Sequence, residues 1–385
     1  MTKTKLTLAL LGACTLFCAQ SQAAELIVGG MIDTGVRLYH TRDGVNGGQT
    51  NVEMADGMRD ANRVMFIGSE KLTDETDLGF WLEASYASDS GAMKTSGSLF
   101  DRGAYLWLQN DSYGQLSAGR IGVMRSGGTP LTFDITGQRI NPFGTGWGDI
   151  GSPMLSLPFY GFPVSNMIQY DTPKFGGLQA HFQYSFAVSN DADVTEGTSY
   201  ADRYSAAALT YDSEKLNLVA MVDLMNENSK AAPQDDALGV LVGGNLHFDA
   251  VTLYSSAAWF RDSDWIPSLP GFSDYSLFEG LDRINGWSAT VGARIPAWGG
   301  SVNIYGLYMD ADYDDNVTTE RAAQIGKDLK RMAAAVGYEY PLSKRTTVYG
   351  AAAIYKDKIE LTAANGHEFK NPSSAQVILG LHHNF

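Results

Sequence analysis

Cysteine is nearly absent from this chain of 385 residues. Its two cysteines, Cys14 and Cys18, lie in an N-terminal stretch that we expect to be removed, so the mature chain would contain no thiol. A disulfide framework and a cysteine nucleophile are thereby excluded. Long hydrophobic runs are also missing after the N-terminus, where no stretch reaches about 18 consecutive apolar residues. A helical membrane protein is therefore not expected.

The N-terminal stretch, residues 1–23, has the parts of an export signal in the usual order. A basic start is followed by the apolar core LTLALLGACTLFCA and by a small-x-small triplet at 21–23. We expect the mature chain to begin near Ala24. Lipoprotein processing at Cys14 is the alternative, although the apolar run continues past that residue to Ala19.

Basic residues are outnumbered, with 28 Lys and Arg against 43 Asp and Glu, and the net charge is −15. Removal of Lys3 and Lys5 with the signal changes the net charge to −17. An acidic surface of this kind argues against a nucleic acid as partner.

The mature sequence alternates with a period of two, as half-exposed strands require. In LIVGGMIDTGVRL, apolar residues from Leu26 to Leu38 share one face, while Asp33 and Arg37 share the other. Seven short turn-forming stretches lie at 69–77, 109–114, 171–177, 211–215, 247–250, 294–300 and 340–346. Eight longer segments lie near 40–61, 87–101, 120–165, 189–202, 225–237, 261–286, 310–330 and 356–374.

Alternating short and long connections predict 16 strands with both termini on the side of the short turns. This asymmetry is typical of a transmembrane β-barrel, in which a closed sheet satisfies every backbone group in lipid. Sixteen strands enclose a lumen too wide for side chains to fill, so an aqueous channel follows.

Seven stretches carry a resemblance to a known family: GGMIDTGV (29–36), NRVMFIGSEKL (62–72), DRGAYLWL (101–108), YGQLSAGR (113–120), NMIQYDTPKFGGLQAHFQYSFA (166–187), VGYEYPLSKRTTVYGAAA (336–353) and GLHHNF (380–385). In number and order they resemble the general diffusion porins of the Gram-negative outer membrane. The resemblance implies an all-β, 16-stranded antiparallel barrel formed by residues 24–385 as one domain. It also implies that 120–165, the third external loop, folds into the lumen and constricts it.

The same resemblance implies a homotrimer in the outer membrane that lets ions and small hydrophilic solutes diffuse passively. The expected partners are outer-membrane lipid, lipopolysaccharide, the outer-membrane assembly machinery and those solutes. No cofactor, metal or catalytic residue is expected. A substrate-selective porin with a narrower, aromatic-lined eyelet and a plugged structural or adhesive barrel are the alternatives.

Four residues are the candidates for the constriction. Arg63 and Arg102 match the family's basic residues on the barrel wall, and Asp134 and Asp149 are the only acids of the third loop. Wall charges and loop acids would create a transverse field that sorts ions. Solvated interior charges or turn residues would look the same in the sequence, and Arg125 and Arg139 of this loop could offset its acids.

Other positions depart from the family pattern. Gln169 stands where many relatives have a basic residue, and Met65 and Ile67 occupy lumenal positions that are usually polar or small. These departures predict a weaker transverse field and a less polar eyelet. A mature charge of −17 and few basic wall residues favour weak cation selectivity. The chain ends on Phe385, which we expect to anchor the closing strand and to serve as an assembly signal.

A barrel enzyme is the rival class. It would need a nucleophile with a positioned base, yet no G-x-S-x-G or H-E-x-x-H spacing is present. His382 and His383 are adjacent and would point to opposite faces of a strand, so they cannot hold one metal together.

Overall fold

The computed structural model describes residues 25–126, 129–144, 147, 150, 163–188, 195–198, 200–227, 235–263, 269–272, 283–313, 328–362 and 366–385. The expected signal, 1–23, lies outside these residues, as does Asp149. No helix among the described residues has both the length and the apolar composition needed to cross a membrane.

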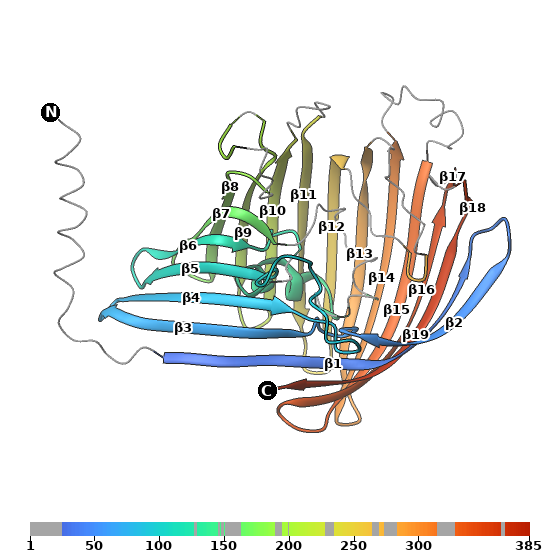
Figure 1. Cartoon of the computed structure of the whole chain (residues 1–385), viewed down its shortest axis with the longest axis horizontal. Coiled ribbons are helices and arrows are strands. Elements are labelled where there is room, and N and C mark those ends of the chain that lie inside the picture. The colour runs from blue at the N-terminus through green and yellow to red at the C-terminus, as the bar shows by residue number, and fades with distance from the viewer. Residues whose placement is uncertain are drawn as a thin grey trace.

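Within the described residues, seventeen strands form one sheet. They are β1 (Glu25–Arg42), β2 (Gly48–Asp56), β3 (Arg63–Thr73), β4 (Thr76–Ser85), β5 (Gly103–Asn110), β6 (Gly114–Ile121), β7 (Val164–Asp171), β8 (Leu178–Ser185), β9 (Arg203–Asp212), β10 (Leu216–Asn226), β11 (Ala237–His247), β12 (Thr252–Ser263), β13 (Ile284–Ala297), β14 (Gly300–Tyr313), β15 (Asp328–Pro341), β16 (Thr346–Lys358) and β19 (Ser373–Asn384). Figure 1 shows them following one another around the barrel.

The sheet is antiparallel and closed. β1 pairs with β19 from Met31↔Asn384 to Arg42↔Ser373. On its other edge, β1 pairs first with β3 and then with β2, so these two strands share one place in the barrel. The barrel therefore has 16 strand positions, and the predicted fold class is confirmed. Closure pairs the first strand with the last, as a barrel in lipid requires, although in the described pairings β2 pairs with β1 alone.

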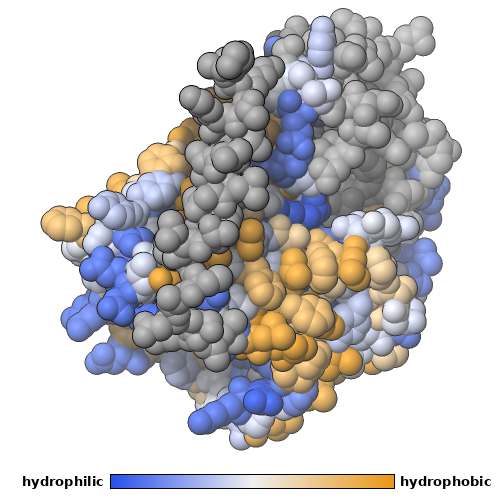
Figure 2. Space-filling model, turned by 60° about the vertical axis from the view of Figure 1, so that its left-hand side comes forward, coloured by the Kyte–Doolittle hydropathy of each residue, from blue (hydrophilic) through white to orange (hydrophobic). Residues whose placement is uncertain are grey.

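Alternation places apolar side chains outside and polar ones inside. On β1, Leu26, Val28 and Val36 are 63%, 59% and 50% exposed, whereas Asp33 on the opposite face is fully buried. Other strands repeat the pattern, and Glu83, Ser117, Gln169, Thr210, Asn303 and Asp357 are all 0% exposed. Figure 2 shows a broad hydrophobic area on one face of the molecule, bordered by hydrophilic residues. An apolar outer band around a polar interior is the pattern of a barrel that spans lipid.

All seven predicted short turns are present, as 74–75, 111–113, 172–177, 213–215, 248–251, 298–299 and 342–345. The first long connection was placed wrongly, because β1 and β2 extend into 40–61 and leave only 43–47 between them. GQTNVEMAD contains Gly and polar residues, but it alternates, and its Val52 and Met54 are exposed on the outer face. The last connection contains a small pair of strands, β17 (Glu360–Thr362) and β18 (Glu368–Lys370).

The third long connection runs over 122–163, close to the predicted 120–165. Its described residues contain three consecutive short helical segments: α2 (Pro130–Thr132), the π-helix η1 (Phe133–Gly137) and α3 (Gln138–Ile140). Pro130 suits the first position of a helix, because a backbone N–H at that position has no partner within the helix and proline lacks this N–H.

The closing strand β19 alternates like the others. Val377, Leu379 and Leu381 are 44%, 63% and 44% exposed on the outer face. Phe385 continues the ladder, since it exchanges backbone hydrogen bonds of 3.0 and 3.2 Å with Gly30. The partner stretch on β1 is Gly30–Arg42, because residues 25–29 pair only with β3.

Candidate functional site

The third connection packs against the face of the strands that points away from the exposed apolar residues. α3 contacts β10, β11 and β12, and the Asn245 side chain donates to the Arg139 carbonyl at 3.1 Å. Three wall glycines make room for the connection. A Cβ at Gly243 would lie 2.7 Å from Ile140, one at Gly292 2.8 Å from Pro142, and one at Gly337 2.7 Å from Phe143. Only residues without a side chain allow this close approach.

Trp147 fixes the next part of the connection. Its indole packs edge-to-face on Tyr349 of β16, with ring centroids 5.0 Å apart, and on Phe143 at 5.2 Å. Its backbone N–H donates to the Arg59 carbonyl in the segment between β2 and β3. Trp147 is 2% exposed, so this aromatic contributes packing between connection and wall.

Two polar cavities lie between the connection and the wall. The larger, of about 570 Å³, is lined by Asp134, Gln138 and Arg139 of the connection and by wall residues that include Lys174, His181, Asp212, Tyr254 and Arg294. The smaller, of about 230 Å³, is lined by Phe133, Gln138, Phe143 and Trp147 and by Arg59, Asp60, Tyr254, Arg294 and Glu339. Gln138, Tyr254 and Arg294 border both cavities.

The two predicted basic wall residues come together on a carboxylate. Glu83 Oε1 accepts from Arg63 Nη1 at 3.1 Å and from Arg102 Nε at 2.6 Å, while Glu83 Oε2 accepts from the Trp81 indole at 2.8 Å. Glu83 is fully buried and both arginine side chains are 14% exposed. This triad carries a formal charge of +1, and none of its members borders either cavity.

The predicted loop acids do not join this triad. Asp134 is exposed and borders the larger cavity, and among the described residues its carboxylate forms no ion pair. Arg139 donates to the Asp134 backbone carbonyl at 2.5 Å and forms an ion pair with Asp212 at the end of β9. Arg125 is paired with the buried Asp223 of β10. Both loop arginines are thus paired with wall acids.

Sequence reasoning missed a second charged group at the smaller cavity. Glu339 of β15 accepts from Arg59 Nη2 at 2.8 Å and from Arg294 Nη2 at 2.7 Å. The Arg59 guanidinium also contacts Asp60. One signal was available, since Glu339 is the acid at an inward position of VGYEYPLSK, but its partners could not be read from the sequence.

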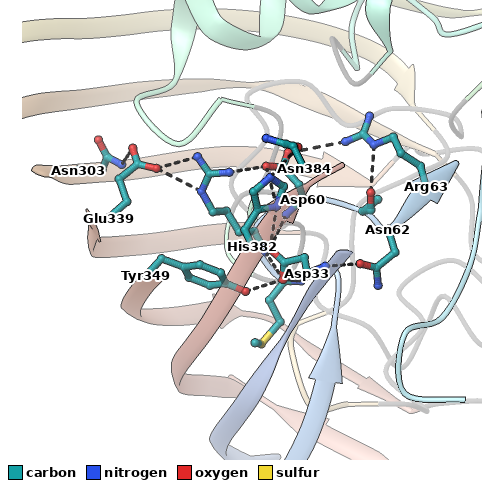
Figure 3. Close-up of polar contacts among 12 residues, drawn as sticks. Asp33, Asp60, Asn62, Arg63, Asn303, Glu339, Tyr349, His382 and Asn384 are labelled. Carbon is teal, nitrogen blue, oxygen red and sulfur yellow. Dashed lines mark hydrogen bonds and ion pairs between the residues drawn. The ribbon is translucent and has the colours of Figure 1, made fainter. Parts of the chain in front are cut away.

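A hydrogen-bond network is centred on Asp33, and Figure 3 shows Tyr349 and His382 beside this carboxylate. Asp33 of β1 accepts from the Tyr349 hydroxyl at 2.6 Å and from the backbone N–H groups of Met58, Arg59 and Asp60 at 3.1 to 3.5 Å. His382 of β19 lies 3.5 Å from the same carboxylate. The strands at the closure of the barrel thereby position the segment that carries Arg59.

The arrangement presents fixed charges of both signs to spaces of water-accessible size, which is how a pore discriminates among ions. In the described part of the chain, no group of three or more His, Cys, Asp or Glu is arranged to hold a metal ion. A closed barrel with an apolar outer band, a polar interior and charged internal cavities defines a channel-forming outer-membrane protein.

Comparison with known proteins identifies the family. The chain belongs to the Gram-negative porin family, which matches residues 7–359. It is 30% identical over 369 residues to outer membrane porin protein 32 of Delftia acidovorans, covering 93% of this chain and 90% of the relative. It is 29% identical over 415 residues to an outer membrane porin protein of Bordetella pertussis, covering all of both chains.

Solved structures show the same fold at lower identity. An anion-selective porin from Comamonas acidovorans has a TM-score of 0.66 at 21% identity, over 94% of this chain and 100% of that chain. OmpT of Vibrio cholerae in its trimer form has a TM-score of 0.59 at 12% identity, over the same shares. The protein is therefore an outer-membrane porin of a Gram-negative bacterium that forms a passive diffusion channel. Neither the substrate-selective nor the plugged alternative is favoured by these relatives.

Proposed function

We propose that the third connection narrows the lumen and that the charges around its two cavities decide which small solutes pass. The supporting observation is that Gln138, Tyr254 and Arg294 border both cavities, so a solute leaving one cavity meets the same residues as it enters the other. The two cavities therefore share part of their lining, as neighbouring sections of one path between the connection and the wall would.

Shortening the connection tests this proposal. Replacement of residues 130–147 by a short Gly-Ser linker should raise single-channel conductance severalfold in planar bilayers, because the segment that occupies the path is gone. Heat modifiability on gels checks that the barrel still closes. Unchanged conductance in a closed barrel would contradict the proposed constriction.

The ion preference that we propose is weakly cationic. Arg63 and Arg102 share Glu83, so much of their charge is balanced on the wall, whereas Asp134 is an exposed acid at the larger cavity. The name of the Comamonas structure states the opposite preference for that protein, which shares 21% identity with this chain. Reversal potentials in a KCl gradient test the proposed cation preference, and strong anion selectivity would overturn the proposal.

We also propose a homotrimer that conducts without catalysing a reaction. Support for assembly comes from the fold shared with OmpT in its trimer form. Conductance that appears in groups of three equal steps, with no hydrolysis of lipid or peptide substrates, is the expected result. Steps that appear only singly would contradict the trimer.

Phe385 is proposed to anchor the closing strand and to act in membrane assembly. Its ring lies against Gly30, where a Cβ would come within 2.6 Å of the ring. Deletion of Phe385 should lower the yield of assembled protein in the outer membrane far more than the conductance of the molecules that do assemble. Normal yield after deletion would refute this role.

A further inference from the structure

His382 of β19 is a buried histidine with one ring nitrogen that lacks a hydrogen bond. Its side chain is 4% exposed, and its Nε2 lies 3.1 Å from Asn384 Oδ1. Because a carboxamide oxygen only accepts, Nε2 carries a proton in this arrangement. Nδ1 is buried and forms no hydrogen bond with the described residues. A buried polar atom without a partner costs free energy, so its presence in the closing strand calls for a reason.

Two carboxylates face this nitrogen. Asp33 Oδ2 lies 3.5 Å from His382 Nδ1, and Asp60 Oδ2 lies 3.8 Å from it. Figure 3 shows the three side chains together. A neutral ring presents the lone pair of Nδ1 to both acids, whereas a proton on Nδ1 would give each acid a charged donor. Imidazole is the side chain that ordinarily changes its charge between pH 5 and 8.

Charged and titratable groups surround His382 on the elements packed against it. They are Asp33 on β1, Arg59 and Asp60 in the segment between β2 and β3, Arg63 on β3 and Tyr349 on β16. Arg59 extends the chain of contacts to Glu339, which also accepts from Arg294. Asp60, Arg59, Glu339 and Arg294 border the smaller cavity, while His382 is not among its lining residues. His382 therefore reaches this cavity only through its neighbours.

Protonation of His382 changes the balance of charge beside the smaller cavity. Two cations and three acids are connected there, apart from the triad around Glu83, and we call them the closure group: Arg59, Arg294, Asp33, Asp60 and Glu339. The formal charge of the closure group is −1 while His382 is neutral. A proton on His382 compensates this excess acid.

We infer that His382 is a positioning residue that makes the ion selectivity of the pore depend on pH. Its protonated ring attracts the carboxylates of Asp33 and Asp60, competes with Arg59 for Asp60 and cancels the excess negative charge beside the smaller cavity. Cation preference should therefore weaken as the pH falls. The inference rests on the proposed function, because it assigns a control to one of the two cavities. The segment that responds also holds the third connection, since the Arg59 carbonyl accepts from the Trp147 backbone N–H.

The expected change in selectivity is about twofold. The smaller cavity, of about 230 Å³, has a radius of about 4 Å, so an ion at its centre lies roughly 9 Å from His382. A unit charge at that distance, screened in 0.1 M salt, changes the occupancy of each ion about 1.4-fold, so the cation-to-anion permeability ratio should fall about twofold between pH 8 and pH 5. His181 and His247 border the larger cavity, so the effect of His382 is measured as a difference between proteins.

Reversal potentials of the intact protein in planar bilayers, near 0.1 M KCl at pH 8 and pH 5, test the inference. His382→Gln keeps a donor for Asn384 but has no charge to gain, and should lose the twofold change. His382→Lys carries a fixed charge and should show the selectivity of the acidic state at both pH values. His383→Gln is the matched control, because His383 is the next residue, points to the opposite face of β19 and bonds the Thr346 hydroxyl at 2.9 Å. It should respond to pH as the unmodified protein does.

Two results would overturn the inference. One is an equal pH response in His382→Gln and the unmodified protein, even if the variant is less stable, since His382 would then have a structural role alone. The other is a ring signal of His382, assigned in NMR spectra of histidine-labelled protein by its loss in His382→Gln, that does not titrate between pH 5 and pH 8. Failure of the proposed constriction is distinguishable, because conductance that rises when 130–147 is replaced shows the constriction whether or not His382 controls selectivity.

Discussion

Replacement of Asp134 by Asn should shift ion selectivity toward anions. Asp134 is exposed at the larger cavity, and its carboxylate forms no ion pair with the described residues. Asn has nearly the same size and keeps a polar side chain, so the variant removes one charge with little change of shape. A change in selectivity would then report the field of this carboxylate.

The size of the shift follows from the cavity. A sphere of about 570 Å³ has a radius of about 5 Å, so an ion in this cavity lies roughly 6 Å from a lining carboxylate. One unit charge at that distance in water contributes about 0.7 kcal/mol. Screening in 0.1 M salt, with a Debye length of about 10 Å, reduces this energy to about 0.4 kcal/mol. Without this carboxylate, cations should occupy the cavity about twofold less often and anions about twofold more often. The cation-to-anion permeability ratio should therefore fall about fourfold.

Reversal potentials measured across a tenfold KCl gradient centred near 0.1 M provide the assay. The same measurement near 1 M should show almost no shift, because the Debye length is then about 3 Å. Asp111→Asn, in the exposed turn between β5 and β6, is the matched control and should have no effect at either salt concentration. No shift at 0.1 M, or an equal shift at 1 M, would refute the role assigned to Asp134.

Three further perturbations have defined outcomes. Glu83→Gln leaves Arg63 and Arg102 without their shared carboxylate, and should lower barrel stability by about 2–4 kcal/mol in a denaturant titration; a loss below 0.5 kcal/mol would show that lumenal water replaces Glu83. Gly337→Val drives a side chain into Phe143 and should alter conductance, whereas Gly306→Val, whose Cβ would meet its nearest atom at 3.7 Å, should leave conductance unchanged. Burial opposes ionisation of Asp43, but hydrogen bonds from His367, Val45 and Asn46 outweigh it and hold the pKa of this carboxyl below its usual range. The contribution of Asp43 to stability is therefore complete above about pH 4 and is lost as the pH falls further. Hydrogen exchange at 43–47, corrected for intrinsic rates, should rise only below that pH. Protection that persists down to pH 1 would contradict the assignment.

The strands could be predicted because alternation and turn chemistry are local. The outer face of β1 and all seven short turns follow from residues that are close in the sequence. β2 was missed because GQTNVEMAD opens with Gly and polar residues, which resemble a loop as well as a strand near the rim of a barrel. Its assignment depends on pairing with β1, and pairing is a tertiary property.

The site was predictable only in part, because its charges are paired through register. Arg63 and Arg102 were found by resemblance, but their meeting on Glu83 requires β3, β4 and β5 to align correctly. Arg59 and Glu339 are 280 residues apart and meet only when the barrel closes. A shift of one residue in β4 or β15 would turn Glu83 or Glu339 to the lipid face.

Paired and unpaired internal charges differ in their effects on structure and on ions. Arg63, Arg102, Arg125 and Arg139 each meet an acid of the barrel wall, as Glu83, Asp223 and Asp212 accept their hydrogen bonds. A paired charge presents a weak field at a distance but fixes the position of its side chain, so these groups hold the connection and the wall in shape. An unpaired charge does the reverse, because its field reaches a passing ion while its position matters little. Substitutions in the paired groups should therefore change stability and conductance before selectivity, and a substitution at Asp134 should change selectivity alone.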